Sequence, residues 1–305
     1  MKILVTGGAG YKGVTLVKRL LERGNVVTIL DNFMYGFDSI LHIVNEPKLT
    51  ILQLDIRNIN ASVLSGYDVI YHLAGISGMP ACAANPDSAE SINVISTRKL
   101  NSLLQKDQLL IYASTTSFYG ASGDGCDETV QTQPVSIYGR TKYEAERIVM
   151  ERGNSIALRF ATVFGIGARM RNDLLVNDFT YKAVNERAIV IFAGYSKRTF
   201  IHIDDAISGY LFALDNANKM RDNIYNVGDE SLNFSKIDIA DTIHKYVDFE
   251  IVNSTLPDLD VRNFLVSFEK IRTLGYKTTL SLDDGIKDLI KLYKFYKVYS
   301  HYNII

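Results

Sequence analysis

Residues 2–13 read Lys-Ile-Leu-Val-Thr-Gly-Gly-Ala-Gly-Tyr-Lys-Gly and run into an amphipathic stretch over 14–23. This pattern predicts a buried strand, a glycine-rich turn and a helix. Gly7 permits a tight turn, Gly10 lets the backbone approach a phosphate, and Gly13 lets the helix pack close to the sheet. Because free amides at a helix N-terminus favour an anion, the turn predicts a site for the pyrophosphate of a dinucleotide.

The next predicted strand, 26–30, ends at Asp31, where an acidic residue is expected to bind the adenosine ribose hydroxyls. A 2′-phosphate carries about two negative charges near pH 7, and the carboxylate would repel it. No arginine flanks Asp31, since Asn32 and Phe33 follow it. The sequence therefore predicts NAD as the cofactor, in preference to NADP.

Composition bounds the class of protein. A chain of 305 residues is long enough for one two-lobed body with a large core. Its 33 basic and 34 acidic residues nearly cancel, so charge gives no reason to expect a nucleic-acid or membrane partner. No apolar run reaches the length of a bilayer span and a predicted strand begins at once, so we expect no signal peptide and a cytoplasmic location. Cys82 and Cys126 lie in no metal-ligand pattern, which predicts free thiols and no bound metal.

Apolar runs alternate with helix-like segments, which predicts parallel strands joined by right-handed crossovers. The expected fold class is α/β, a doubly wound parallel sheet of the Rossmann type with helices on both faces. The predicted strands are 2–6, 26–30, 49–53, 68–73, 108–113 and 156–160, and the predicted helices are 11–23, 58–64, 87–105 and 136–152.

The pattern loosens after Gly165, where the chain is expected to reverse direction. We predict that residues 1–165 form the NAD-binding domain, with 199–228 returning to it. Residues 166–198 and 229–305 are predicted to form a smaller, interleaved C-terminal substrate lobe. Its predicted elements, together with those of the returning segment, are helices at 173–185, 204–214 and 283–297 and strands at 188–193, 199–203 and 225–227.

Tyr138 and Lys142 lie four residues apart in the predicted helix 136–152, so both side chains occupy one helix face, one turn apart. A phenol ionises at about pH 10, too high for an efficient base at neutral pH. A nearby ammonium group and a cationic oxidised nicotinamide both favour the phenolate, so the pair can act as a base when the cofactor is bound. The alternative is a surface pair, because 18 tyrosines make a chance match easy.

The order of the elements favours the active-site interpretation. Four hydroxyl residues, Ser114 to Ser117, follow the strand predicted at 108–113. Doubly wound sheets bind ligands at the C-terminal edge of their strands, which is where these hydroxyls are expected. One of them can share a hydrogen bond with the substrate oxygen that Tyr138 deprotonates.

Three motifs together resemble the extended short-chain dehydrogenase/reductase family, and within it the NAD-dependent nucleotide-sugar epimerases and dehydratases. They are the turn at 6–13, the hydroxyl cluster before Phe118-Tyr119-Gly120, and Tyr138-Gly139-Arg140-Thr141-Lys142. Stretches at 55–57, 72–75, 158–165, 198–205 and 225–228 are also similar, so the resemblance covers nearly the whole chain. It implies an NAD-dependent enzyme whose partner is a nucleotide-diphosphate sugar.

The resemblance also implies roles for single residues. The catalytic residues would be Thr115, Tyr138 and Lys142. Cofactor contacts would be Gly7, Gly10, Tyr11, Lys12, Gly13, Asp31, Asn32, Asp55, Ile56, Leu73, Ala74, Gly75, Asn93, Tyr138 and Lys142. Substrate contacts would be Ser77, Thr116, Ser117, Thr162, Arg198 and Arg262. Arg169 and Arg171 would either bind an anionic substrate or be solvated.

The sequence departs from the family pattern at several positions. Lys12 replaces a usual aliphatic residue; it would contact phosphate or point to solvent, and we favour solvent. Thr162 stands where an asparagine often contacts the substrate phosphate. Dehydratases of the family tend to carry an Asp-Glu pair where this chain has Thr116 and Ser117. Hydroxyls are poor proton-transfer groups at neutral pH, so the chemistry left is that of the alcohol base and the nicotinamide.

We therefore expect oxidation at a sugar alcohol, at C4, followed by epimerisation through a 4-keto intermediate. The alternatives are a 4-dehydrogenase that releases the keto sugar, a dehydratase, and an NAD-sensing or scaffold protein of the same fold. The family resemblance implies a homodimer formed by the helices that carry Asn93 and Tyr138, with Leu100, Leu103 and Leu104 as compatible apolar positions.

Overall fold

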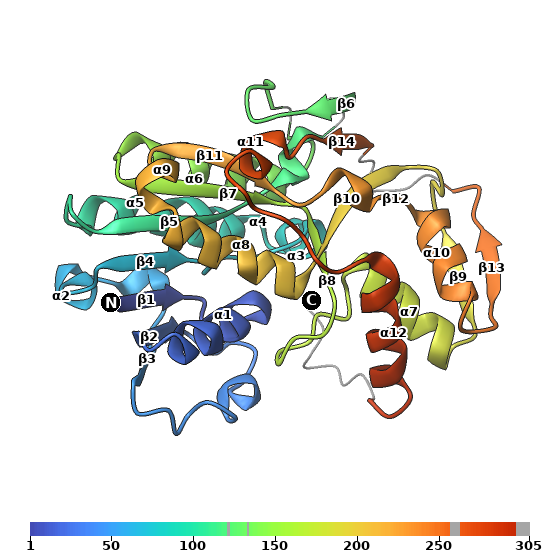
Figure 1. Ribbon diagram of the computed structural model, residues 1–305, viewed down its shortest axis with the longest axis horizontal. Coiled ribbons are helices and arrows are strands. Elements are labelled where there is room, and N and C mark those ends of the chain that lie inside the picture. Colours follow the sequence, from blue (N-terminus) through green and yellow to red (C-terminus); the bar gives the residue numbers. More distant parts are fainter. Residues whose placement is uncertain (121–122, 133, 257–262, 297–305) are drawn as a thin grey trace.

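Figure 1 shows the computed structural model, which describes residues 1–120, 123–132, 134–256 and 263–296. A seven-stranded parallel sheet runs through it in the order β3-β2-β1-β4-β5-β7-β11, which confirms the predicted doubly wound sheet. The strands are β1 (Lys2–Thr6), β2 (Val26–Asp31), β3 (Leu49–Gln53), β4 (Val69–His72), β5 (Leu109–Thr115), β7 (Ser155–Phe160) and β11 (Asn223–Val227).

Helices cover both faces of this sheet (Figure 1). On one face, α1 (Tyr11–Glu22) and α8 (Ile203–Asp215) share a core with strand residues such as Ile3 and Val5. On the other face lie α2 (Ala61–Leu64), α5 (Ser96–Leu103) and α6 (Ile137–Glu151). Leu100 and Leu104 are buried in this second core against the sheet of their own chain, and Leu103 packs at its margin. The homodimer therefore stays a prediction.

A smaller lobe lies beyond the carboxyl ends of the strands (Figure 1). Its helices α7 (Leu175–Asn185), α10 (Lys236–His244) and α12 (Leu282–Tyr293) share one core. Its sheets pair β8 (Thr162–Phe164), β10 (Lys197–His202) and β12 (Asn233–Ser235), and separately β9 (Ala188–Ile191) and β13 (Glu250–Asn253). Within the segment 199–228, α8 and β11 lie with the main sheet, while β10 pairs in this lobe.

Several elements differ from the sequence prediction. The helix predicted over 87–105 is divided into α4 (Pro86–Ala89), a π-helical segment η3 (Glu90–Ile95) and α5. Asn93 lies in the wider turn of η3 and is buried. The remaining short elements are α3 (Met79–Ala84), α9 (Ala217–Met220), α11 (Glu269–Arg272), β6 (Gly123–Cys126), β14 (Phe264–Val266), η1 (Asp38–Ile40), η2 (Ile56–Asn58), η4 (Thr116–Tyr119) and η5 (Glu230–Leu232). Within the described ranges, no helix is both long and apolar enough to cross a membrane.

The strand order reverses at β1, which lies between β2 and β4. Crossovers leave β1 toward β2 and return to β4 on the other side, so a crevice opens at the carboxyl end of β1. The glycine turn that follows β1 sits at this switch point. The fold thus places the predicted phosphate site where doubly wound sheets bind their ligands.

Close packing explains two of the turn's glycines. Gly7 has φ +70°, and a Cβ there would lie 2.7 Å from the backbone nitrogen of Ala74. A Cβ on Gly13 would lie 2.2 Å from the carbonyl oxygen of Gly7. Both neighbours are backbone atoms that cannot turn aside, so only glycine fits.

We expect Gly13→Ala to destabilise the cofactor-free protein by about 2–4 kcal/mol, because the turn must shift to admit the methyl group. Gly10→Ala is the matched control, since its Cβ would lie 3.2 Å from the same carbonyl and needs a smaller adjustment. Urea unfolding followed by circular dichroism measures both variants. Equal losses of stability in the two would contradict this account of the turn.

Candidate active site

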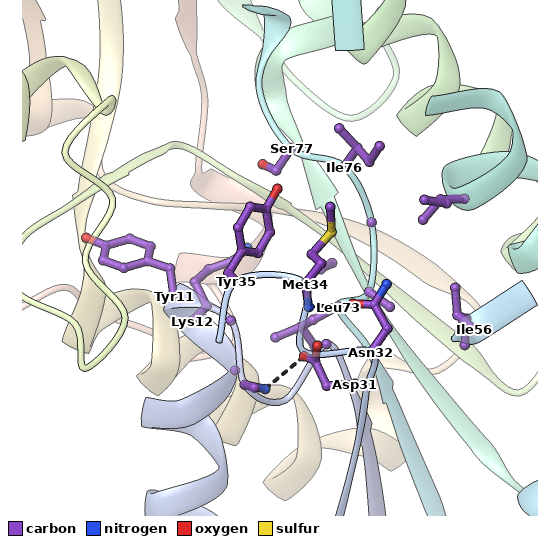
Figure 2. Close-up of a pocket in the computed structure, with 18 of the residues that line it drawn as sticks. Tyr11, Lys12, Asp31, Asn32, Met34, Tyr35, Ile56, Leu73, Ile76 and Ser77 are labelled. Carbon is purple, nitrogen blue, oxygen red and sulfur yellow. Dashed lines mark hydrogen bonds between the residues drawn. The ribbon is translucent and has the colours of Figure 1, made fainter. Parts of the chain in front are cut away.

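A cavity opens at the switch point, bounded by residues of the main sheet's loops and of the segment that leads into the smaller lobe. It is lined by residues from the turn after β1, the loops after β2 and β4, the end of β5, and α6. Figure 2 shows part of its wall. Of the predicted site residues, those that line it are Gly7, Gly10, Tyr11, Lys12, Gly13, Asp31, Asn32, Asp55, Ile56, Leu73, Ala74, Gly75, Ser77, Tyr138 and Lys142.

One end of the cavity suits a pyrophosphate. Gly10 is the N-cap of α1 and has an extended backbone with no side chain to cap the helix. The first amides of α1 therefore lie beside the cavity wall without a side-chain cap. Helix N-termini with free amides bind anions through these N–H groups and the helix dipole.

The Asp31 carboxylate is held by two backbone amides. It accepts hydrogen bonds from Ala9 at 3.0 Å, drawn in Figure 2, and from Phe33 at 2.9 Å. Burial raises the pKa of Asp31, although these hydrogen bonds oppose the rise. Nearby, a bidentate contact from Arg57 lowers the pKa of Asp55 to about 2. Asp31 is thus fixed at the cavity wall with its backbone partners already in place.

Arg169 reaches the cavity from the second lobe. Its guanidinium lies 3.9 Å from the centre of the Tyr35 ring, and the residue is only 5% exposed. Its Nε and Nη2 atoms are buried and find no hydrogen-bond partner among the described residues. A buried guanidinium with free donors beside a helix N-terminus fits an anionic ligand, so the residues present suit the diphosphate of a dinucleotide.

The other end of the cavity carries the tyrosine and lysine pair. Ser136 caps α6 by accepting a hydrogen bond from the Gly139 amide at 3.0 Å, and this starts the helix just before Tyr138. Lys142 is 8% exposed, and its Nζ lies 4.1 Å from the centre of the Tyr112 ring. Burial, and to a smaller extent the positive charge of Lys12, lower the pKa of Lys142 to about 7, while the Glu146 carboxylate opposes the change.

A buried ion pair anchors α6 to the sheet. Arg159 of β7 and Glu146 of α6 are 3% and 1% exposed and meet in a two-pronged contact of 2.7 and 3.0 Å. Ser114 of β5 donates to the same carboxylate at 2.6 Å. Burial disfavours the charge of Arg159, but the Glu146 carboxylate holds the pKa of Arg159 above its usual value. The elements α6, β5 and β7 are therefore joined at one carboxylate.

Two further contacts shape the loop after β4. Asn93 accepts from the Ile76 amide at 2.8 Å and donates to the Ile76 carbonyl at 3.0 Å, so it holds the loop without lining the cavity. Arg171 donates to Ser77 at 3.2 Å and pairs with Asp173. Arg171 is buried and lines the cavity, as Arg169 does, so neither side chain is solvated.

Several predicted residues do not line the cavity. Thr115 donates to the Ser117 hydroxyl at 3.0 Å, and Thr116 donates to the Phe160 carbonyl at 3.2 Å. Thr162 begins β8, and Arg198 is buried in β10. Arg262 lies outside the described residues. Of the four hydroxyl residues, Ser114 lines the cavity, although its hydroxyl donates to the buried Glu146 carboxylate.

The expectation that Lys12 points to solvent is wrong. Its Nζ turns inward and lies 4.4 Å from the centre of the Phe160 ring. Lysine side chains cover apolar surface readily, and the space between α1 and the end of β7 accepts the ammonium beside an aromatic face.

The sequence profile of the NAD dependent epimerase/dehydratase family matches residues 3–228. The chain belongs to this family. The Bacillus cereus UDP-glucuronic acid 4-epimerase, crystallised with UDP-glucuronic acid and NAD, is similar in structure, with a TM-score of 0.86 and 26% identity over 96% of this chain and 99% of that one. An uncharacterised UDP-glucose epimerase of Bacillus subtilis is 31% identical over 68% of this chain and 71% of its own. UDP-glucuronic acid decarboxylase 1 of Arabidopsis thaliana is 25% identical over 95% of this chain and 69% of its own length.

This epimerase/dehydratase family member is therefore an NAD-dependent enzyme, and the predicted family, enzyme character and cofactor are confirmed. Met34 and Tyr35, which extend along the cavity from the loop after Asp31 (Figure 2), are not predicted from the sequence. No periodicity marks this loop, so its two side chains become visible only in three dimensions. For Arg169 the sequence left two alternatives, anion binding and solvation, because the same loop pattern fits a solvated or a buried guanidinium.

We expect Asp31→Asn to raise the affinity for NADP relative to NAD by about tenfold or more, because a carboxylate no longer faces the 2′-phosphate. The amide oxygen of asparagine keeps one acceptor for the turn. Isothermal titration with each cofactor measures the ratio. Asp68→Asn, an exposed change beside the amino end of β1, is the control. An unchanged ratio in Asp31→Asn would remove Asp31 from cofactor selection.

Lys12 generates a prediction about stability. Burial, aided by Arg171, lowers the pKa of Lys12 from 10.5 to about 7, so between these pH values the unfolded chain binds more protons than the folded one. Stability of the native protein then rises with pH across this window. Lys12→Met has no group that titrates at this position, so its stability does not gain from this source as the pH rises. The free energy of unfolding of the native protein should therefore rise relative to that of Lys12→Met by about 1 kcal/mol or more from pH 7 to pH 9.5.

Urea unfolding at the two pH values measures this difference. Lys18→Met, at an exposed position of the same helix, should show no such trend. A difference in the free energy of unfolding between Lys12→Met and the native protein that stayed constant with pH would mean that the pKa of Lys12 is not lowered in the folded protein.

Proposed function

We propose that this enzyme oxidises a nucleotide-diphosphate sugar at C4 and returns the hydride to the 4-keto sugar, so that the net reaction is 4-epimerisation. The observation that supports this most is the placement of Tyr138 and Lys142 in the same cavity as the glycine turn and Asp31. A base, a cation and a dinucleotide site that share one cavity are what alcohol oxidation needs.

Tyr138 is the base in this proposal and accepts the proton of the C4 hydroxyl. NAD, when bound, supplies the hydride acceptor for the same carbon. Lys142 brings a positive charge to the Tyr138 end of the cavity and favours the phenolate there. Ser114 and Thr115 end the neighbouring strand, and one of these hydroxyls orients the substrate oxygen. We keep Thr115 in this role, although its hydroxyl contacts Ser117 when no substrate is bound.

The residues after Thr115 favour epimerisation over dehydration. A dehydratase needs groups that remove a C5 proton and protonate a leaving hydroxide. Thr116 donates its hydroxyl to the Phe160 carbonyl, and Ser117 contacts Thr115. Neither side chain is an acid or base at neutral pH. The Glu146 carboxylate, one turn after Lys142 on α6, is engaged by Arg159 and Ser114.

Cationic residues of the second lobe support an anionic substrate. Arg171 lines the cavity beside Ser77, near the loop that would border the sugar. Arginine suits phosphate and carboxylate because its planar donors can bind two oxygens at once. Thr162, Arg198 and Arg262 remain proposed substrate contacts, since a nucleotide extends well beyond the reacting sugar.

Decarboxylation is a second candidate, favoured by the similarity to a UDP-glucuronic acid decarboxylase. If the substrate is a uronic acid, its 4-ketone lies β to the carboxylate, and carbon dioxide can leave without a further acidic residue. A 4-dehydrogenase would instead release the keto sugar. All three outcomes begin with the same proton transfer to Tyr138.

Product analysis separates these outcomes. The NAD-loaded enzyme is incubated with UDP-, CDP-, GDP- and dTDP-linked hexoses and uronic acids, and products are resolved by chromatography and NMR. We expect one substrate to give its C4 epimer with no net change of cofactor. A pentose product would favour decarboxylation, and a 4,6-dehydrated sugar would contradict the proposal.

Tyr138→Phe should lower turnover by about a thousandfold or more, because the base is lost while the ring and the fold are kept. The affinity for NAD should stay within about threefold of that of the native enzyme. Tyr143→Phe is the matched control, since Tyr143 is on the same helix and does not line the cavity. Native turnover in Tyr138→Phe would exclude Tyr138 as the base.

A further inference from the structure

Lys12 is a half-buried cation that the proposed reaction does not use. It belongs to the glycine turn, yet its Nζ lies 4.4 Å from the centre of the Phe160 ring and 5.5 Å from that of Tyr210. In the part of the chain that the structure describes, no carboxylate or carbonyl accepts a hydrogen bond from it. Two aromatic faces are the main compensation for its charge.

The charges around Lys12 are of the same sign. Repulsion between Lys12 and Lys142 of α6 lowers the pKa of Lys142. Arg171, from the second lobe, lowers the pKa of Lys12 in the same way. Phe160 ends β7, and Tyr210 lies on α8 with its phenol buried. The elements packed about the ammonium thus bring cations and rings. An ammonium in such a place costs free energy, and protein cores rarely keep one without a use.

The position of Lys12 relates it to the reacting ring of the cofactor. Lys12, Tyr138 and Lys142 line the same cavity. The ring that the Lys12 ammonium contacts belongs to Phe160, which is paired in the sheet with Thr115, the residue proposed to orient the substrate oxygen. On the proposed function, a bound nicotinamide would lie near Tyr138, in the cavity that Lys12 also lines.

We propose that Lys12 sets the preference of the enzyme for the redox state of its cofactor. The oxidised nicotinamide ring is a cation, whereas the reduced ring is neutral. An ammonium held beside the ring repels the first and leaves the second unaffected. The enzyme then binds NADH more tightly relative to NAD⁺ than a protein without this charge.

This preference would serve the proposed reaction. Loss of a hydride from the C4 carbinol, with its hydroxyl proton passing to Tyr138, would convert a bound oxidised ring to the neutral reduced form and would end its repulsion by Lys12. The enzyme would then hold NADH more tightly than NAD⁺ while the keto sugar rotates and presents the opposite face of its C4 carbonyl to the cofactor. The hydride then returns to the same carbon before the cofactor can leave.

The test measures cofactor binding without any sugar at pH 6, because the pKa of Lys12, lowered to about 7, leaves its side chain charged there. Dissociation constants of NADH, by fluorescence, and of NAD⁺, by competition, are obtained for the native protein, Lys12→Met and Lys12→Gln. We expect the ratio of the NAD⁺ constant to the NADH constant to fall by about tenfold or more in both variants, because the charge is lost. Lys18→Met, which removes an exposed charge from the same helix, should leave the ratio unchanged.

An unchanged ratio in the two Lys12 variants, with equal effects on both cofactor forms, would overturn the proposal. An equal fall of this ratio in Lys18→Met would also overturn the proposal, because the change would then come from the net charge of the protein and not from the position of Lys12. The outcome is separable from that of the proposed function. Tyr138→Phe tests the base by turnover, whereas the ratio depends on the ring and Lys12 alone.

Discussion

The ion pair between Arg159 and Glu146 is the interaction on which the rest of the site depends. It joins β7 to α6 inside the protein, and the Ser114 hydroxyl ties β5 to the same carboxylate. Removing either charge alone would leave the other buried without its partner, which costs several kcal/mol. The pair therefore fixes where α6 lies over the end of the sheet. Tyr138 and Lys142 precede Glu146 by two turns and one turn of that helix, so their positions follow from it.

The second constraint is the contact between the two lobes. Tyr11, next to Lys12 in the glycine turn, donates its hydroxyl to the Gly165 carbonyl at 2.7 Å, where the chain leaves for the smaller lobe. Arg169 and Arg171 follow directly and enter the cavity from that side. The turn that suits the dinucleotide thus also holds the segment that carries the second lobe's cations. The glycine turn and the smaller lobe are thus joined by short contacts at one corner of the cavity.

The parts of the site with a strong local sequence pattern could be predicted from the sequence. The turn at 6–13 is readable because strand, glycine spacing and helix each have a strong local signature, and Asp31 because it ends the next apolar run. Tyr138 and Lys142 are readable because helical spacing places them on one face. The helix predicted over 87–105 hides its π-helical segment, since a one-residue widening of a helix leaves the apolar pattern almost unchanged. Lys12 is misread because a charge predicts solvent, and the two alternatives for Arg169 stay open in the sequence because only tertiary packing shows what covers a charged side chain.

A crystal structure of the enzyme with NAD and its nucleotide sugar is the most direct test of the central claim, that one cavity brings the Tyr138 phenol, the Lys142 ammonium and the nicotinamide to a single sugar carbon. The account predicts the Tyr138 oxygen within hydrogen-bond distance of the C4 oxygen, with the nicotinamide between C4 and the α1 turn. A nicotinamide bound away from Tyr138, or a sugar whose reacting carbon faces another side chain, would contradict it.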